Sequence, residues 1–234
     1  MAGPITGSEH IHQMNLRAVL FDYGMVLSRP ACPVAHQELI SLFGMDAAIF
    51  ERFYWANRHD YDAGRFDGES YWHKVASDAG TVLTPPTVAK LIQSDVRMWS
   101  DTDASMLAWA RSVGSDGIRT GILSNMCAEL LVVLEKTRSW FHEFRYSTWS
   151  CRVGAAKPEP AIYQAALAKL EVQPDQVLFL DDKLENIRAA EEFGIRGIVF
   201  ENLSRLRTDL ETLGLAKFLP PIAADPMPEG SLVR

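Results

Sequence analysis

The sequence predicts a doubly wound α/β fold, in which helices cover both faces of a parallel sheet and a helical cap is inserted after the first strand. Three observations support this prediction. Short apolar runs of strand length recur along the chain, helical patterns lie between them, and residues 29–100 interrupt the alternation with helical patterns alone. Strands joined by helical crossovers pair in parallel, because each crossover returns the chain to the same end of the sheet.

The apolar runs have the pattern of strands that are buried on both faces. The first run, RAVLF over residues 17–21, ends at Asp22. Runs without polar alternation are typical of parallel sheets, because helices cover both sides of such a sheet. Three further runs of this kind span residues 117–125, 176–182 and 195–200.

Helical patterns separate these predicted strands. They span residues 127–141, 159–172 and 183–194, the last ending at Gly194, a common helix stop. The insertion holds four more, at residues 34–44, 47–64, 68–80 and 86–99, together with many of the aromatic residues. We therefore expect a core domain over residues 16–28 and 101–219, a cap over residues 29–100, a flexible tail over residues 1–15 and a Pro-rich tail over residues 220–234.

Composition argues against several classes of protein. The 234 residues are 47% hydrophobic and carry a formal net charge of -7 without a basic cluster, which argues against a nucleic-acid partner. No apolar stretch approaches the length of a membrane span. Cys32, Cys127 and Cys151 form no CxxC pair, so neither a disulfide framework nor a zinc site is indicated. We expect a soluble cytoplasmic protein.

Chemically active side chains follow the predicted strands. Asp22 ends the first strand, Ser124 and Asn125 end the second, and the pair 181–182, both aspartate, ends the third, while Lys157 precedes a helix. Each has an ordinary structural explanation, as a turn former, a helix cap or a solvated charge. Ligands of open parallel sheets bind at the carboxyl ends of the strands, however, so the joint arrangement indicates one site.

Four motifs in this order resemble those of the haloacid dehalogenase superfamily of aspartate-nucleophile hydrolases. They are VLFDYGMVL, ILSN, KPEPAIY and FLDDKLENIRAAEEFGI, and the resemblance covers about residues 17–202. Within the superfamily, the motif sequences most resemble those of the sugar-phosphate phosphatases and of the phosphatase domain attached to some epoxide hydrolases. That branch places a helical cap between its first and second motifs, where residues 29–100 stand here.

The resemblance implies a Mg²⁺-dependent phosphatase that acts on a small phosphorylated substrate. Asp22 is then the nucleophile, and Lys157 supplies a fixed positive charge to it and to the transferring phosphoryl group. The implied Mg²⁺ ligands are Asp22, Asp182 and the Gly24 carbonyl, supported by Asp181 and, behind them, Asn186. Ser124 and the backbone N–H groups at Asn125 are expected to hold phosphate oxygens. Arg58, His59 and Tyr61 of the cap are expected to contact the rest of the substrate.

Gly24 departs from the family pattern, which usually has a second aspartate there as the general acid. Such an acid contributes roughly 10²- to 10⁴-fold in rate. Three interpretations remain open. In the first, the leaving group needs little protonation, as in a sugar 1-phosphate or an acyl phosphate. In the second, a cap residue replaces the acid, and the candidates are His36, Arg58, His59, Asp60 and Tyr61. In the third, the protein is a dehalogenase.

A binding protein that retains the fold without catalysis is an alternative from another class, and Gly24 is the feature that favours it. The dehalogenase interpretation conflicts with the adjacent aspartates 181 and 182, which place like charges beside Asp22 unless a cation lies among them. The sequence leaves the identity of the substrate and the oligomeric state open.

Overall fold

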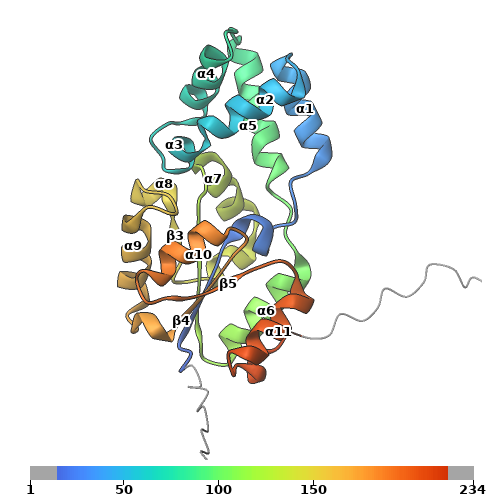
Figure 1. Cartoon of the computed structure of the whole chain (residues 1–234). Coiled ribbons are helices and arrows are strands. Elements are labelled where there is room, and N and C mark those ends of the chain that lie inside the picture. Colours follow the sequence, from blue (N-terminus) through green and yellow to red (C-terminus); the bar gives the residue numbers. More distant parts are fainter. Residues whose placement is uncertain (1–14, 221–234) are drawn as a thin grey trace, which may run out of the picture.

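A five-stranded parallel sheet forms the centre of the protein in its computed structural model, which describes residues 15–220. The strand order is β3-β2-β1-β4-β5, and every pair is parallel. The strands are β1 (Ala18–Phe21), β2 (Arg119–Ser124), β3 (Thr148–Trp149), β4 (Val177–Asp181) and β5 (Arg196–Val199). From β1, the chain adds β2 and β3 on one side of the sheet and then β4 and β5 on the other side. The strand order therefore reverses at β1. The prediction of a doubly wound α/β fold is confirmed (Figure 1).

Both faces of the sheet are buried, which explains the unbroken apolar runs. Val19 and Phe21 of β1 pack on one side, in a cluster that includes Trp109 of α6 (Ala104–Ser115). Ala18 and Leu20 pack on the other side with residues of α9 (Pro160–Leu170) and α10 (Leu184–Glu191). Because successive side chains of a strand point to opposite faces, each face needs its own apolar set.

Helices alone form the segment between β1 and α6. They are α1 (Pro33–Phe43), α2 (Ala47–Ala56), α3 (Arg58–Asp62), α4 (Gly68–Asp78) and α5 (Pro85–Met98). Figure 1 shows them together beyond the carboxyl end of β1, with α7 (Ala128–Thr137) and α8 (Ser150–Val153) facing them from the sheet domain. Phe50, Tyr54 and Trp72 are buried among these helices, and the ring of Phe50 stacks on both others, with centroids 5.5 and 6.3 Å away. We call α1–α5 the cap.

Several elements differ from the sequence-based expectation. The helix expected over 47–64 divides at Asn57, whose Nδ2 donates to the Phe53 carbonyl (3.2 Å) and to Asp78 Oδ2 (3.0 Å). The helix expected over 127–141 ends at Thr137 and is followed by η2 (Ser139–Glu143). The strand β3, α6 and α11 (Leu203–Thr212) were not predicted. The remaining short turns are η1 (Tyr23–Leu27), η3 (Pro174–Gln176) and η4 (Ala216–Phe218).

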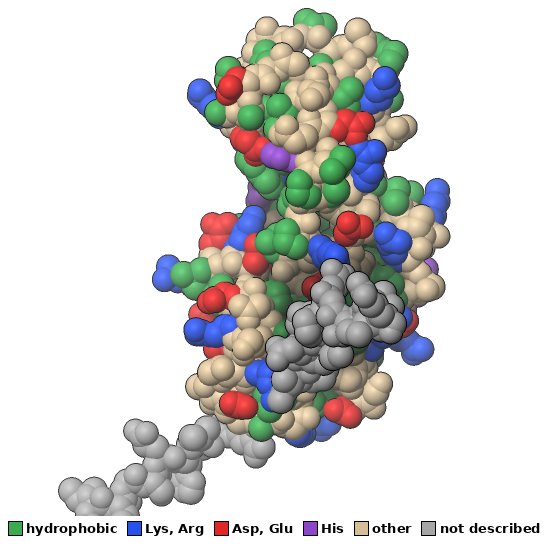
Figure 2. Space-filling model, turned by 90° about the vertical axis from the view of Figure 1, so that its right-hand side faces the viewer, with side chains coloured by type: hydrophobic (Ala, Val, Ile, Leu, Met, Phe, Trp, Pro, Cys, Tyr) green, Lys and Arg blue, Asp and Glu red, His purple; other side chains and the backbone are tan. Residues whose placement is uncertain are grey.

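Within the described residues, no helix combines the length and the apolar character that crossing a bilayer requires. On the face shown in Figure 2, basic and acidic side chains are interspersed. The expected tails, residues 1–15 and 220–234, lie outside the described residues except for one residue each.

Candidate active site

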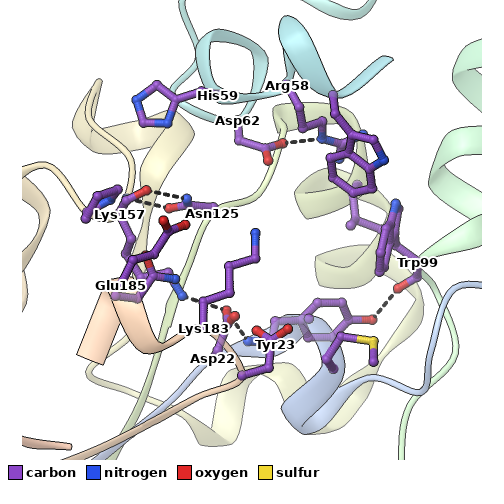
Figure 3. A pocket seen from close by; sticks show the side chains of 17 residues that line it. Asp22, Tyr23, Arg58, His59, Asp62, Trp99, Asn125, Lys157, Lys183 and Glu185 are labelled. Carbon is purple, nitrogen blue, oxygen red and sulfur yellow. Dashed lines mark hydrogen bonds and ion pairs between the residues drawn. The ribbon is translucent and has the colours of Figure 1, made fainter. Parts of the chain in front are cut away.

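A cavity of about 470 Å³ lies between the cap and the carboxyl ends of the central strands (Figure 3). Cavities of roughly 300 to 1,000 Å³ are usual for small-molecule sites. Its lining comes from both parts of the molecule: Asp22, Asn125, Lys157 and Asp182 from the sheet domain, and Trp55, Arg58, His59, Asp62 and Trp99 from the cap and its exit. The structure therefore joins several of the expected site residues in one space.

Lys157 contacts both the expected nucleophile, Asp22, and Asp181 at the end of β4. Its Nζ lies 2.9 Å from Asp22 Oδ1 and 2.6 Å from Asp181 Oδ2, and it donates to the Leu123 carbonyl (2.9 Å). The side chain of Lys157 is almost fully buried, so these three acceptors replace its water. Asp22 Oδ1 also accepts the Tyr23 N–H at 2.7 Å. The carboxylate is thus held at a defined place, with Oδ1 turned toward its donors.

The burial of this ion pair changes the pKa of both partners. Burial raises the pKa of the Asp22 carboxyl to about 7, although the Lys157 ammonium opposes that rise. Burial alone lowers the pKa of Lys157, but the carboxylates of Asp181 and Asp22 outweigh it and raise that pKa above its usual value. Lys157 therefore stays positively charged beside the carboxylate that it neutralises.

Asp181 lies beneath the cavity and contacts several donors. It is fully buried and does not line the cavity. Its oxygens accept from Lys157, from the Lys183 N–H (2.8 Å) and twice from Asn186 Nδ2 (2.9 and 3.1 Å). These donors engage both oxygens, so Asp181 contacts the side chains of Lys157 and Asn186. Its support of the metal ligands stays a prediction.

The acidic residues fit a hard divalent cation. Carboxylate oxygens of Asp22, Asp181 and Asp182 lie within 4.8 Å of one another. Burial and then the charge of Asp181 raise the pKa of Asp182 above its usual value. The buried Asn186 Oδ1 has no hydrogen-bond partner among the described residues. An all-oxygen set with a spare acceptor nearby suits Mg²⁺, which keeps several water ligands.

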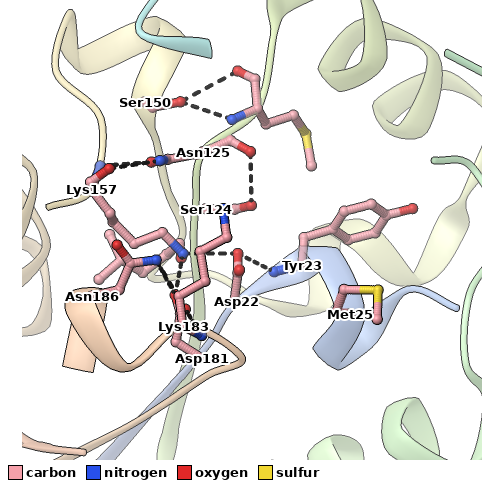
Figure 4. Close-up of polar contacts among 12 residues, drawn as sticks. Asp22, Tyr23, Met25, Ser124, Asn125, Ser150, Lys157, Asp181, Lys183 and Asn186 are labelled. Carbon is pink, nitrogen blue, oxygen red and sulfur yellow. Dashed lines mark hydrogen bonds and ion pairs between the residues drawn. The ribbon is translucent and has the colours of Figure 1, made fainter. Parts of the chain in front are cut away.

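The Ser124–Asn125 motif lies where it was expected, but the side chain of Asn125 has another partner. Its Oδ1 accepts the Lys157 N–H at 2.7 Å and its Nδ2 donates to the Lys157 carbonyl at 2.9 Å (Figure 4). Ser124 Oγ is buried and donates to the Asn125 carbonyl at 3.3 Å. The amide of Asn125 is therefore used to hold the backbone of Lys157, and only its backbone N–H remains for a phosphate oxygen.

The expected cap residues have three different environments. Arg58 lines the cavity, but its guanidinium pairs with Asp62 (2.9 Å) and Asp95 (2.9 Å) in the interior of the cap. His59 also lines the cavity, and its Nε2 lies 2.6 Å from Glu159 Oε1. Tyr61 does not line the cavity: its hydroxyl donates to Glu129 (3.0 Å) and so joins the cap to the sheet domain.

The other candidate acids and bases of the cap are engaged elsewhere. Asp60 pairs with Arg65 at 2.6 Å, and His36 pairs with Glu51. Neither residue lines the cavity.

Several cavity residues were not identified from the sequence. They are Tyr23, Met25, Trp55, Asp62, Trp99, Leu130, Pro158, Lys183 and Glu185. Lys183 and Glu185 stand inside the fourth motif, so a closer inspection of that motif could have found them. Trp55 and Trp99 carry no such signal, because an aromatic residue on a cap helix has the same pattern whether it faces the core or a cavity.

The fold and site define a capped α/β hydrolase with a lysine-paired aspartate at the end of its first strand. A model of the haloacid dehalogenase-like hydrolases matches residues 16–194, and the chain belongs to this family. The family assignment made from the four motifs is thereby confirmed.

Curated relatives include a phosphatase, a flavin mononucleotide hydrolase and a bifunctional epoxide hydrolase. The chain is 26% identical to bifunctional epoxide hydrolase 2 of Sus scrofa over 240 residues, covering 91% of this chain and 42% of that protein. It is 37% identical over 78 residues to flavin mononucleotide hydrolase 1 of Arabidopsis thaliana, covering 32% of each. The chain thus spans less than half the length of these two relatives. A sesquiterpene phosphatase of Aspergillus oryzae is 24% identical over 78% of this chain and 88% of its own.

Solved structures share the fold. A point mutant of a haloacid dehalogenase family enzyme from Bacteroides thetaiotaomicron, in complex with magnesium and inorganic phosphate, has a TM-score of 0.65 at 19% identity, covering 82% of this chain and 98% of its own. An L-2-haloacid dehalogenase has a TM-score of 0.60 at 20% identity, covering 78% of this chain and 85% of its own. At these identities the likeness shows the fold alone.

Proposed function

We propose that the protein is a Mg²⁺-dependent phosphatase of the cytoplasm that hydrolyses a small phosphorylated metabolite through an aspartyl-phosphate. The observation that carries the proposal is the contact of Lys157 with both Asp22 and Asp181, beside the Asp182 carboxylate. A phosphate dianion approaches a carboxylate only where positive charge offsets their repulsion. Lys157 brings one such charge to Asp22, and a cation held by the acidic residues would supply more.

Each residue has a defined part in the proposed reaction. Asp22 forms a bond to phosphorus while the bond from phosphorus to the leaving oxygen breaks, and that oxygen takes the electron pair. Water then attacks the phosphorus of the aspartyl-phosphate and releases Asp22 with orthophosphate. Lys157 neutralises the free Asp22 carboxylate before the first step and after the second, and the backbone N–H of Asn125 holds a phosphate oxygen.

Asp22, Asp182 and the Gly24 carbonyl would hold Mg²⁺. When bound there, the cation supplies charge neutralisation to the phosphoryl oxygens. Asn186 also lines the cavity, and its Oδ1, which has no partner among the described residues, would be available to a water ligand of the cation. The free cysteines Cys32, Cys127 and Cys151 are consistent with a reducing compartment.

Release of orthophosphate from p-nitrophenyl phosphate tests the proposal, with EDTA and with Mg²⁺ added back. We expect activity only with the cation. Halide release from 2-chloropropionate in the presence of EDTA, without any phosphatase activity, would instead make the protein a dehalogenase.

A trapping experiment separates an enzyme from a binding protein of the same fold. Beryllofluoride forms an adduct with a competent aspartate nucleophile in the presence of Mg²⁺. We expect a mass increase on the wild-type protein and none on Asp22→Asn. Absence of the adduct on the wild type, together with absence of turnover, favours the non-catalytic alternative that Gly24 raises.

A further inference from the structure

The cavity has two chemically different sides. His59, Asn125 and Lys157 lie on one side, and Tyr23 and Trp99 lie on the other, with Asp22 at the base (Figure 3). Trp55 joins the second side, because its ring meets that of Trp99 edge to face, with centroids 6.4 Å apart. We call Tyr23, Trp55 and Trp99 the aromatic wall.

The polar atoms of the aromatic wall are already used by the protein. The Tyr23 hydroxyl donates to the Trp99 carbonyl at 2.8 Å. Trp55 Nε1 donates to Glu51 at 2.8 Å, and Trp99 Nε1 donates to the Tyr54 hydroxyl at 3.3 Å. The indole rings of Trp55 and Trp99 therefore have surface to offer a ligand, whereas Tyr23 is buried. None of the three has a spare hydrogen-bond donor, which is a poor match for the hydroxyl groups of a sugar.

Part of this apolar surface is open to water in the absence of a ligand. Trp55 is 49% exposed and Met25, at the same cavity, is 41% exposed. Met25 has a backbone φ of 60°, an uncommon conformation for a residue with a side chain. Exposed apolar side chains gathered in a cavity are typical of a place that a ligand covers.

The wall is connected directly to the nucleophile. Tyr23 donates its N–H to Asp22 Oδ1 and its hydroxyl to the carbonyl of Trp99, so one residue joins Asp22 to the wall. A phosphate bound at Asp22 and Lys157 therefore has the wall as its neighbour on the side away from His59. The group attached to the phosphate through the leaving oxygen is the part of a substrate that meets the wall.

We propose that the leaving group is a planar aromatic ring that carries the phosphate oxygen directly, so that the preferred substrate class is an aryl phosphate. This inference rests on the proposed phosphatase function and specifies its substrate. Gly24 supports it independently: an oxygen on an aromatic ring departs as a weakly basic phenolate and needs less help from an acid than an alkoxide does. In the reaction the phosphorus–oxygen bond breaks, the ring oxygen keeps the electron pair and then takes a proton from water.

A series of substrates tests the inference. We expect kcat/KM to rise from methyl phosphate and glucose 6-phosphate to phenyl phosphate and further to 1-naphthyl phosphate. Acetyl phosphate, which has an easily displaced but small leaving group, reports the phosphoryl chemistry without the ring. Cleavage of acetyl phosphate with no preference for the ring compounds overturns the inference alone, whereas no cleavage of any of these compounds overturns the proposed function itself.

Variants of the wall supply the second arm of the test. Trp55→Ala should lower kcat/KM for 1-naphthyl phosphate relative to acetyl phosphate by about 10-fold, mainly through KM, because a stacked ring pair is lost. Trp55→Phe should restore most of that ratio. Ile49→Ala is the matched control, since Ile49 is an exposed apolar residue of the same helix outside the cavity, and its ratio should equal that of the wild type. An unchanged ratio in Trp55→Ala contradicts the inference, and circular dichroism shows whether each variant is folded.

Discussion

The side-chain amide of Asn125 closes two hydrogen bonds on the backbone of Lys157, accepting its N–H at 2.7 Å and donating to its carbonyl at 2.9 Å. This pair joins the end of β2 to the segment that precedes α9, so the position of the buried lysine depends on a residue far from it in the sequence. Lys157 in turn contacts Asp22 and Asp181. The neutral side chain of Asn125 therefore fixes the backbone of the residue that carries the positive charge, Lys157.

Asn125→Ala removes both of these hydrogen bonds and frees the backbone of Lys157. We expect kcat to fall by about 10- to 100-fold, because a small displacement of a charge that stabilises the transition state is costly. Asn125→Asp keeps the acceptor and loses the donor, so its kcat should lie below that of the wild type. Initial rates with p-nitrophenyl phosphate measure the effect. A wild-type rate in Asn125→Ala would show that Lys157 does not need this support.

Asp22→Asn tests the nucleophile. An amide does not attack phosphorus under these conditions, so turnover should fall by at least about 10³-fold. The amide oxygen can still accept the Tyr23 N–H, and Lys157 keeps its contact with Asp181, so the unfolding temperature should not fall. Rates and thermal unfolding are measured on the same preparation. Substantial residual activity places the nucleophile at another residue.

Gly24→Asp tests whether a general acid can be added to this site. The backbone at Gly24 has φ −61° and ψ 131°, which any residue adopts, and a Cβ placed there meets no atom within 4 Å. The site therefore has room for an acid. We expect the rate with an alkyl phosphate to rise relative to that with an aryl phosphate, by up to about 10²-fold.

Gly24→Asn is the control for this prediction, because asparagine has nearly the same size and no acidic proton. If the Asp and Asn variants give the same ratio of alkyl to aryl rates, the acid at this position makes no contribution.

Glu159 provides a prediction about pH and stability. It contacts His59 and Arg65 of the cap at 2.6 and 2.8 Å. Burial raises the pKa of Glu159, but the hydrogen bonds from His59 and Arg65 outweigh it and lower that pKa below its usual 4.5. A lowered pKa means that the stabilisation is present above pH 4.5 and is lost as the pH falls through the lower value of the folded protein.

Glu159→Gln should therefore lower the unfolding temperature by about 1 to 4 °C at pH 7, the amount expected of exposed ion pairs. The difference from the wild type should shrink as the pH falls below 4.5 and disappear at a pH below the lowered pKa of the folded protein. Glu135→Gln breaks an ion pair with Arg152 that lies within the sheet domain and serves as a comparison. Scanning calorimetry at both pH values measures the difference. A gap between Glu159→Gln and the wild type that is equally large at low pH would show that the charge of Glu159 is not its cause.

The sequence alone was sufficient for the fold class and for the residues that follow the strands. Buried parallel strands and crossover helices produce distinct local patterns, and Asp22, Ser124 and the aspartates 181 and 182 stand directly at strand ends, where an open sheet binds its ligands. The four ordered motifs also identified the family. Those inferences depend on residues that are close together along the chain, and the sequence contains this information directly.

Tertiary structure decided what each side chain touches. Nothing in the sequence distinguishes the indole of Trp55, which faces the cavity, from that of Trp72, which is buried in the cap. Likewise, only the fold directs the amide of Asn125 to Lys157 and the hydroxyl of Tyr61 to Glu129. The physical reason is that helical periodicity specifies which face of a helix is apolar, whereas contacts between distant segments depend on how the cap packs against the sheet domain.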